Sequence, residues 1–213
     1  MLYIATVAGL FGQSGIPVAN TSRVLSSVEI RNYQGEKLSS ITDFRENSIK
    51  GPQHVNISTY KLEIGGRVTR PRNMTYNEVR DLPAYQKVIT LHCVEGWDVT
   101  LLWEGVKVMD ILDTAGISPD ANTVIFSAYD GYSTSLPLDY IEKNDILLAY
   151  GMNNVTLPED RGYPFELAAQ DRWGYKWIKW VTKIELSNDP NYRGYWEQRG
   201  YSIGGDINKS FFV

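Results

Sequence analysis

From residue 55 onward the chain is a succession of short apolar segments with strand character, separated by turn residues, and this pattern restricts the choice of fold most. Tyr60, Leu62 and Ile64 alternate with polar residues and run into Gly65 and Gly66, as expected for a strand that ends in a turn. We therefore expect a domain dominated by short strands, at 27–31, 60–64, 87–94, 98–103, 123–129, 145–150, 154–157, 165–169 and 177–186, with a hairpin around the Gly-Met-Asn turn between 145–150 and 154–157.

Short helices are predicted in three places between these strands. Thr75 and Glu78 form a capping-box pattern, in which the hydroxyl and the carboxylate each satisfy a free amide at the start of a helix. Residues 106–115 carry apolar side chains at helical spacing and are followed by Gly116, a suitable C-cap. Pro137 fits the first turn of a third helix.

The domain organisation follows from length and local composition. A chain of 213 residues with 43% hydrophobic and 22% charged residues is ordinary for a folded protein with one sizeable core. Residues 12–50 are rich in Gly, Ser, Asn and charge and have no sustained periodicity, which is typical of an arm. We predict an N-terminal arm over residues 1–42 and one α+β domain, with mixed β-sheets and short helices, over residues 43–213.

Charge and cysteine content exclude several classes of function. A net charge of −4 leaves no electrostatic footprint for nucleic acid. A single cysteine excludes an internal disulfide, zinc ribbons, iron–sulfur clusters and a c-type haem attachment within this chain. The two histidines argue against a metal site built from several imidazoles, so any metal must be held mainly by ligands that the protein does not supply.

The chain carries no predicted membrane span, because no apolar run reaches about 18 residues. Residues 2–11 are apolar but lack the positively charged region that begins a signal peptide. They fit either a remnant of an export or anchor segment or a strand or helix that packs on the body. Localisation stays open at this point.

The lone cysteine, Cys93, lies near the end of a predicted strand, beside Glu95. A cysteine in an apolar strand is most often a small buried hydrophobe, but strand ends are also where sites are built. His92 is adjacent in sequence and points to the opposite face of the strand, so it is poorly placed as a base for a cysteine nucleophile. A cysteine hydrolase that pairs Cys93 with the remote His54 stays as an alternative.

Basic and aromatic residues alternate in the stretch 171–180, where Arg172, Lys176 and Lys179 lie among tryptophans. One interpretation is an amphipathic surface strand whose lysine stems cover the rings. The other is a site for a phosphorylated, planar ligand, because the cations bind phosphate and the rings pack on a flat group. The loop 157–165, which contains Arg161, fits either a solvated connection or part of such a site.

Residues 43–201 resemble the molybdopterin-binding domain of the sulfite-oxidase family. The resemblance implies the sulfite-oxidase molybdopterin-binding fold and a molybdenum–molybdopterin cofactor. Four ordered motifs carry it, which are Thr90-Leu-His-Cys-Val-Glu-Gly-Trp97, Ala128-Tyr-Asp-Gly-Tyr-Ser-Thr-Ser135, Leu157-Pro-Glu-Asp-Arg-Gly-Tyr-Pro-Phe165 and Trp173-Gly-Tyr-Lys-Trp-Ile-Lys-Trp180.

The resemblance also implies a set of site residues. It makes Cys93 the thiolate ligand of molybdenum, and thiolates are soft ligands that suit such a metal. Within this hypothesis Glu95, Tyr129 and Asp130 are the candidates for proton handling near the metal. Cofactor-binding positions fall on Arg45, Asn47, Ser48, Ala128, Arg161, Lys176, Trp177, Ile178 and Lys179, with Arg161, Lys176 and Lys179 holding the pterin and its phosphate.

The implied activity is two-electron transfer of an oxygen atom to or from a small-molecule substrate. Sulfite oxidases have small and basic residues after the cysteine, whereas Glu95 here would repel an oxyanion. The cysteine segment is more similar to that of molybdenum methionine-sulfoxide reductases, although those enzymes differ at Arg161 and at Phe165-Glu166. We expect a sulfoxide or N-oxide as substrate. A non-catalytic molybdopterin-binding module and a sulfite-oxidising enzyme are the alternatives.

The resemblance implies an external redox partner, because this chain contains no second redox centre. We expect a haem protein or cytochrome to exchange electrons with it. The chain after Leu186 is too short for the immunoglobulin-like dimerisation domain of sulfite oxidases, so a monomer is expected. An extracytoplasmic location is slightly favoured by the resemblance.

Overall fold

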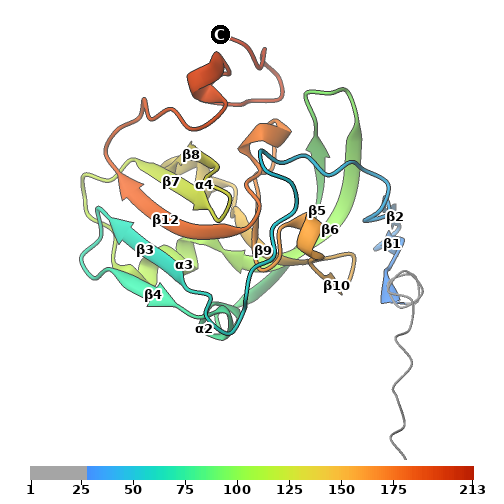
Figure 1. Ribbon diagram of the computed structural model, residues 1–213, viewed down its shortest axis with the longest axis horizontal. Coiled ribbons are helices and arrows are strands. Elements are labelled where there is room, and N and C mark those ends of the chain that lie inside the picture. Colours follow the sequence, from blue (N-terminus) through green and yellow to red (C-terminus); the bar gives the residue numbers. More distant parts are fainter. Residues whose placement is uncertain (1–27) are drawn as a thin grey trace, which may run out of the picture.

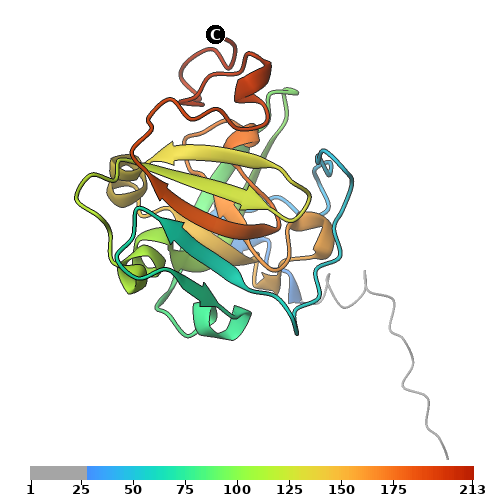
Figure 2. The same ribbon diagram turned by 60° about the vertical axis from the view of Figure 1, so that its left-hand side comes forward.

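The computed structural model describes residues 28–213, and two five-stranded sheets dominate it. The first sheet is mixed, because β3 and β12 pair in parallel and its other neighbours pair antiparallel. Figure 2 shows this sheet nearly face on, with the red-orange β12 in its middle. In spatial order its strands are β4 (Arg72–Met74), β3 (Leu62–Gly66), β12 (Val181–Ser187), β7 (Thr123–Ala128) and β8 (Ser133–Pro137).

The second sheet is antiparallel and is built on a long hairpin. The hairpin pairs β5 with β6 along their length, from Ala84 opposite Val106 to His92 opposite Asp98. In Figure 1 the hairpin is drawn in green and projects beyond the body at its upper end. The strands in spatial order are β10 (Val155–Thr156), β9 (Leu147–Met152), β6 (Asp98–Lys107) and β5 (Ala84–His92), and β11 (Glu166–Ala168) also pairs with β9.

The remaining elements are short. Two two-residue strands, β1 (Asn32–Tyr33) and β2 (Glu36–Lys37), form a separate ribbon. No helix among residues 28–213 is long and apolar enough to cross a membrane. The helices are α2 (Tyr76–Arg80), α3 (Val108–Ala115) and α4 (Leu138–Lys143), and the 3-10 turns are η1 (Glu159–Arg161), η2 (Gly174–Lys176) and η3 (Glu197–Arg199).

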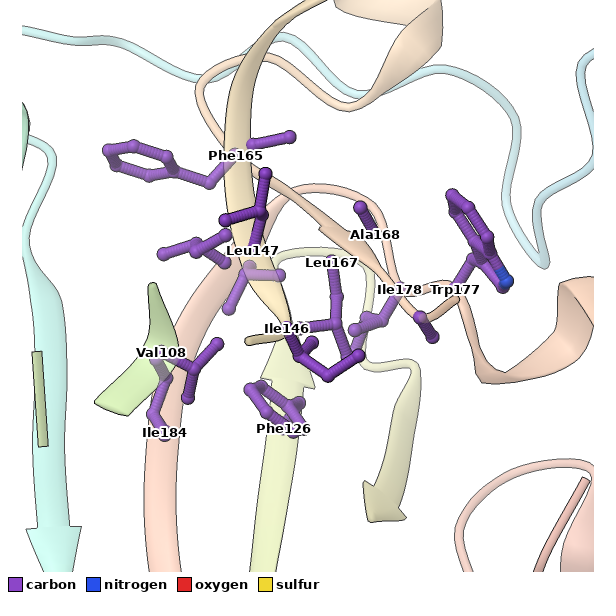
Figure 3. Packing of buried hydrophobic residues seen from close by; sticks show 14 of the residues in the cluster. Val108, Phe126, Ile146, Leu147, Phe165, Leu167, Ala168, Trp177, Ile178 and Ile184 are labelled. Atoms are coloured by element: carbon purple, nitrogen blue, oxygen red, sulfur yellow. The ribbon is translucent and has the colours of Figure 1, made fainter. Parts of the chain in front are cut away.

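The hydrophobic core lies between the two sheets. Phe126 and Ile184 project from the first sheet toward Leu147 and Leu167 of the second, and Val108 of α3 packs beside them (Figure 3). All five side chains are fully buried. The core therefore fixes the sheets face to face and leaves the loops at one end to form a site.

The local predictions are confirmed where the signal is local. Thr75 caps α2 through the amide of Glu78, and the Glu78 carboxylate accepts from the Thr75 amide. Helix α3 ends at Gly116, whose φ of +71° is easy only for glycine. The second sheet contains the predicted hairpin of β9 and β10, but Asn153 and Asn154, both with positive φ, make its turn.

The structure departs from the predicted strands in several places, and β1, β2 and β4 were not predicted. Residues 28–31 form no strand, and Ser27 lies outside the described residues, as does the apolar start of the chain. The predicted strand 177–186 begins only at Val181, because η2 and the positive φ of Trp180 break the extended backbone. Strand β8 was not predicted, since its Ser-Thr-Ser sequence is typical of a turn.

Gly105 allows a close approach between the middle strands of the second sheet. A Cβ atom at this position would lie 2.3 Å from the Leu148 carbonyl oxygen, next to a register shift in the ladder of β6 and β9. We predict that Gly105→Ala lowers the free energy of unfolding by about 2 kcal/mol, measured by chemical denaturation. Gly65→Ala is the matched control, because its Cβ would meet nothing closer than 3.8 Å, and equal losses in both variants would contradict the prediction.

Candidate functional site

A cavity of about 430 Å³ lies at the end of the molecule where the β5–β6 turn meets five other segments. The loop before β3 covers one side of it, and the segment between β11 and β12 covers another. The C-terminal residues complete its wall. The residues used below line it as follows: Phe44, Arg45, Glu46, Asn47, Ser48, Cys93, Glu95, Trp97, Asp130, Tyr132, Arg161, Glu166, Tyr175, Trp177, Lys179, Trp180, Trp196 and Tyr201.

Cys93 is held on the cavity wall by the turn between β5 and β6. Its amide donates to the Trp97 carbonyl at 2.9 Å, and the Gly96 amide donates to the Cys93 carbonyl at 3.0 Å. Gly96 has a φ of +85°, which this turn requires and glycine supplies without strain. The thiol is 8% exposed and faces the cavity. The turn thus presents one sulfur atom to the interior of the site.

The two histidines lie away from the thiol. The His92 imidazole Nδ1 lies 2.7 Å from the Asp98 carboxylate on the other side of the strand, as the alternation of a strand predicts. His54 pairs with Glu159 at 2.6 Å and does not line the cavity. The structure therefore places neither histidine as a base for Cys93, and the cysteine-hydrolase alternative has no geometric support.

The surroundings of Cys93 set its protonation. Burial raises the pKa of the thiol, the amide of Glu95 lowers that pKa by donating to the sulfur, and the Glu95 charge raises it. The Asn47 amide lies 3.8 Å from Sγ and donates to the Glu95 carboxylate at 3.3 Å. Trp97 donates to the same carboxylate at 3.2 Å. A bound soft metal would keep the sulfur deprotonated against this raised pKa.

Arg161 lines the cavity, but its guanidinium donates hydrogen bonds to the neighbouring loop. Its Nε donates to the Ile41 carbonyl at 3.2 Å and its Nη2 to the Phe44 carbonyl at 2.7 Å. The guanidinium also stacks 3.9 Å from the centre of the Phe44 ring. The buried Arg161 therefore fixes the loop that carries Arg45, Asn47 and Ser48.

The two predicted lysines point to different places. Lys179 lines the cavity, and its ammonium pairs with Glu46 at 2.5 Å and lies over the Trp180 ring. Lys176 is fully buried outside the cavity, where its ammonium pairs with Glu197 at 2.6 Å. The Lys176 side chain thus faces the C-terminal residues rather than the space available to a ligand.

The other predicted site residues are divided in the same way. Asp130 is buried and lines the cavity, whereas the neighbouring Tyr129 is 58% exposed and does not. Trp177 lines the cavity and packs against Trp103 with ring centres 5.2 Å apart. The predicted residues that the structure brings together are Arg45, Asn47, Ser48, Cys93, Glu95, Asp130, Arg161, Trp177 and Lys179, and those whose side chains lie elsewhere are Ala128, Tyr129, Lys176 and Ile178.

Glu166 was not predicted as a site residue. It is 5% exposed and lines the cavity from β11, which is buried at all its positions. Desolvation raises the pKa of its carboxyl to about 8, against the opposing charges of Lys179 and Arg161. The carboxyl is therefore mostly neutral at pH 7. The sequence signal was a single acidic residue inside an otherwise apolar strand.

The residues present fit a molybdopterin. The Ser48 hydroxyl is buried at the cavity and has no hydrogen-bond partner among residues 28–213, which leaves a donor and acceptor for a ligand. The same residues contain no cluster of three or more His, Cys, Asp or Glu side chains that could hold a metal. A metal at Cys93 must bring most of its own ligands, as a dithiolene cofactor does, and Trp177 offers a flat surface for a ring system.

Comparison with known proteins shows the family. The family model described as the oxidoreductase molybdopterin binding domain matches residues 49–196, so the chain belongs to this family of molybdenum oxidoreductases. The predicted fold, molybdenum–molybdopterin cofactor and enzyme class are thereby confirmed.

Individual relatives carry several descriptions. An uncharacterized oxidoreductase of Bacillus subtilis is 32% identical over 156 residues, which make up 73% of this chain and 78% of that protein. A putative protein-methionine-sulfoxide reductase subunit of Azospira oryzae is 31% identical over 72% of this chain, and a sulfite oxidase of Arabidopsis thaliana is 26% identical over 70%. This chain spans 58% and 47% of those two proteins.

A solved structure shares the fold. The sulfane dehydrogenase SoxCD from Paracoccus pantotrophus superposes with a TM-score of 0.65 over 87% of this chain and 56% of that one. The two sequences are 18% identical, so the likeness supports the architecture and nothing finer.

Glu166 generates a pH-dependent stability. Its pKa of about 8 in the folded protein lies above the value of about 4.3 for an unfolded chain. Between these values the folded protein binds more protons, so the free energy of unfolding falls as pH rises, by up to about 1.4 kcal/mol per pH unit from this group.

We predict that Glu166→Gln flattens this fall in the cofactor-free protein, measured by urea denaturation between about pH 5 and pH 8. Glu36→Gln is the control, because Glu36 is exposed on β2. Identical slopes for the wild type and Glu166→Gln would contradict the assignment.

Proposed function

We propose that this chain catalyses two-electron oxygen-atom transfer on a small neutral oxide, such as a sulfoxide or an N-oxide, with a molybdenum–molybdopterin bound at Cys93. The observation that carries the proposal is a single buried thiol on the wall of a cavity of about 430 Å³ in which acidic and basic side chains are balanced. The cofactor, when bound, supplies the two-electron redox chemistry by which the substrate loses or gains an oxygen atom.

The cofactor would be held by residues from separate segments. Cys93 would be the metal ligand, and the unpaired Ser48 hydroxyl and the Asn47 amide would bind polar atoms of the pterin. Trp177 would pack on its ring system. Lys179 would bind the phosphate of the cofactor. Its ammonium would exchange the bond to Glu46 for one to the phosphate.

The charge of the cavity supports a neutral substrate. Glu46, Glu95 and Asp130 line it together with the mostly neutral Glu166. Three cations also line it: Lys179 is paired with Glu46, Arg161 is bonded to carbonyl groups, and Arg45 is exposed at the cavity. With Glu166 mostly neutral, three carboxylates stand against three cations, so the cavity has no net positive charge to attract an anion such as sulfite. Glu95, two residues from Cys93, would repel that anion, whereas a neutral oxide avoids the repulsion.

Reduction of an oxide also needs protons. Two electrons and two protons convert a sulfoxide to a sulfide and water. Glu95 and Asp130 line the cavity and are proposed to relay protons, with Glu166 as a third group that holds a proton at neutral pH. Tyr129 is exposed outside the cavity, so its proposed part is to relay protons at the surface.

The electrons are proposed to come from or go to an external haem protein or cytochrome. The names of related proteins include a reductase subunit in Azospira oryzae and a reductase catalytic subunit in Campylobacter jejuni. The word subunit in these names supports the proposal that this chain exchanges electrons with another protein. We propose that the catalytic unit is a monomer comprising residues 43–213 and that it acts outside the cytoplasm.

The metal-ligand role of Cys93 has a direct test. We predict that Cys93→Ser, produced in a molybdopterin-competent host, contains at least about tenfold less molybdenum per protein than the wild type, because an alcohol is a poor ligand for a soft metal. Inductively coupled plasma mass spectrometry of the purified protein measures the metal. Glu36→Gln is the control for handling and yield. Equal molybdenum in all three proteins, or none in the wild type, would overturn the assignment.

The reaction is tested on the molybdenum-loaded wild type. We predict that dimethyl sulfoxide and trimethylamine N-oxide are reduced with reduced benzyl viologen as electron donor, and that sulfite is not oxidised with ferricyanide. Oxidation of sulfite alone would favour the sulfite-oxidising alternative. Full molybdenum occupancy without turnover of any of these compounds would favour a non-catalytic molybdopterin-binding module.

A further inference from the structure

The C-terminal segment, residues 194–213, lies against one end of the cavity. In Figures 1 and 2 it is the dark red chain beyond β12. The matched family model ends at residue 196, so almost the whole segment follows the region that this family model describes. Trp196 and Tyr201 nevertheless line the cavity. The segment therefore contributes to a site that the rest of the chain builds.

A buried ion pair ties the segment to the body. Lys176 and Glu197 both have 0% exposed side chains, and their charged atoms lie 2.6 Å apart. The Thr134 hydroxyl donates to the same Glu197 oxygen at 2.7 Å, and the Lys176 ammonium also donates to the Ile203 carbonyl at 2.9 Å. Gly205 packs on the Lys176 stem, where an added Cβ would lie 2.4 Å from Cγ. The segment thus closes around this one lysine.

A second set of bonds joins the segment to the residues around η2. The Trp173 amide donates to the Gly205 carbonyl at 2.8 Å, and the Trp173 indole donates to the Lys209 carbonyl at 3.1 Å. The Tyr175 hydroxyl donates to the Ser202 carbonyl at 2.7 Å. Much of the basic and aromatic stretch is therefore a platform on which the C-terminal segment is fixed.

The result of this docking is an aromatic face at the cavity. The rings of Trp196 and Tyr201 have centres 5.0 Å apart, and Tyr201 meets Tyr175 edge on at the same distance. Tyr132 also lines the cavity and donates its hydroxyl to the Tyr175 carbonyl. Trp196 and Tyr201 are only half-buried, which leaves part of each ring free for a ligand.

We propose that Trp196 and Tyr201 are specificity-determining residues that bind the flat apolar substituent of an aryl oxide, and that Lys176 and Glu197 are the positioning pair that holds them. The proposal deepens the proposed function and rests on it for the oxide. Aromatic rings attract one another beyond the burial of apolar area, so Trp196 and Tyr201 distinguish an aryl from a methyl substituent. A buried ion pair adds little net stability, which fits a role in placement.

The aromatic face formed by Trp196 and Tyr201, called the wall below, is tested with two substrates that share the reacting group. Methyl p-tolyl sulfoxide carries a ring and dimethyl sulfoxide does not. In molybdenum-loaded Trp196→Ala and Tyr201→Ala we expect kcat/KM for the aryl sulfoxide to fall about tenfold, mainly through KM, and that for dimethyl sulfoxide to change less than about twofold. Phe212→Ala is the matched control, because Phe212 contacts Tyr201, is 55% exposed and does not line the cavity.

A binding measurement separates this proposal from the proposed reaction. Calorimetry of methyl p-tolyl sulfoxide with the oxidised, molybdenum-loaded protein should give a Kd that rises about tenfold in Tyr201→Ala. If the variants lose aryl sulfoxide binding and the wild type reduces no oxide, the role of the wall is supported and the proposed oxide reduction is rejected. Reduction of both oxides with unchanged aryl affinity in the variants would reject the wall alone. A wild type that does not bind the aryl sulfoxide also rejects the wall.

The positioning pair is tested by Glu197→Ala and the conservative Glu197→Gln. Trypsin cleavage after Arg199 and Lys209 reports release of the segment. We expect Glu197→Ala to be cleaved at least about tenfold faster and to lose the aryl preference while keeping dimethyl sulfoxide turnover and molybdenum. Glu197→Gln should restore both properties, because its amide oxygen can still accept from Thr134 and Lys176, and burial lowers the pKa of Lys176 so that its amine can bond without a charged partner. An aryl preference that survives release, or a segment that stays protected in Glu197→Ala, overturns the positioning role.

Discussion

The register of β5 against β6 is the constraint on which the site depends. The pairing runs without a shift from Ala84 opposite Val106 to His92 opposite Asp98, so the residue that follows His92 must turn its side chain to the other face. That residue is Cys93, and the turn closed by Trp97 holds it on the cavity wall. A slip of one residue would exchange the faces and turn the thiol away.

A second constraint is that two of the cations at the cavity, Arg161 and Lys179, are already bonded to other groups of the protein. Arg161 is bonded to the carbonyl groups of Ile41 and Phe44, and Lys179 is paired with Glu46. These bonds fix the loop that carries Asn47 and Ser48 before any ligand arrives. The cavity is thereby preorganised, and it is rich in aromatic side chains without a net positive charge.

The sequence could predict the parts of the structure that depend on near neighbours. The capping box at Thr75, the helix that ends at Gly116 and the opposite orientation of His92 and Cys93 all follow from local spacing, and the structure has each of them. The resemblance of four ordered motifs to the sulfite-oxidase family likewise implied the cofactor, whereas Cys93 taken alone fitted a small buried hydrophobe.

The parts that could not be predicted depend on distant partners. The stretch 177–180 has the alternating pattern of a strand. The 3-10 turn η2 and the positive φ of Trp180 interrupt the extended backbone there, so the side chains of Lys176 and Lys179 do not follow strand alternation. Lys176 meets Glu197, which is 21 residues away in the sequence. Neither propensity nor periodicity contains that contact.

The raised pKa of Glu166 connects the fold to the chemistry. Burial in β11 makes this carboxyl neutral near pH 7, in a cavity that already contains Glu95 and Asp130. A neutral acid adds no further negative charge to the site, yet it keeps a proton in a place that water reaches poorly. An oxide gains protons together with electrons, so a site with separate charged and uncharged carboxyls can supply the proton without attracting an anionic competitor. The burial that costs Glu166 its charge is therefore consistent with selection of a neutral substrate.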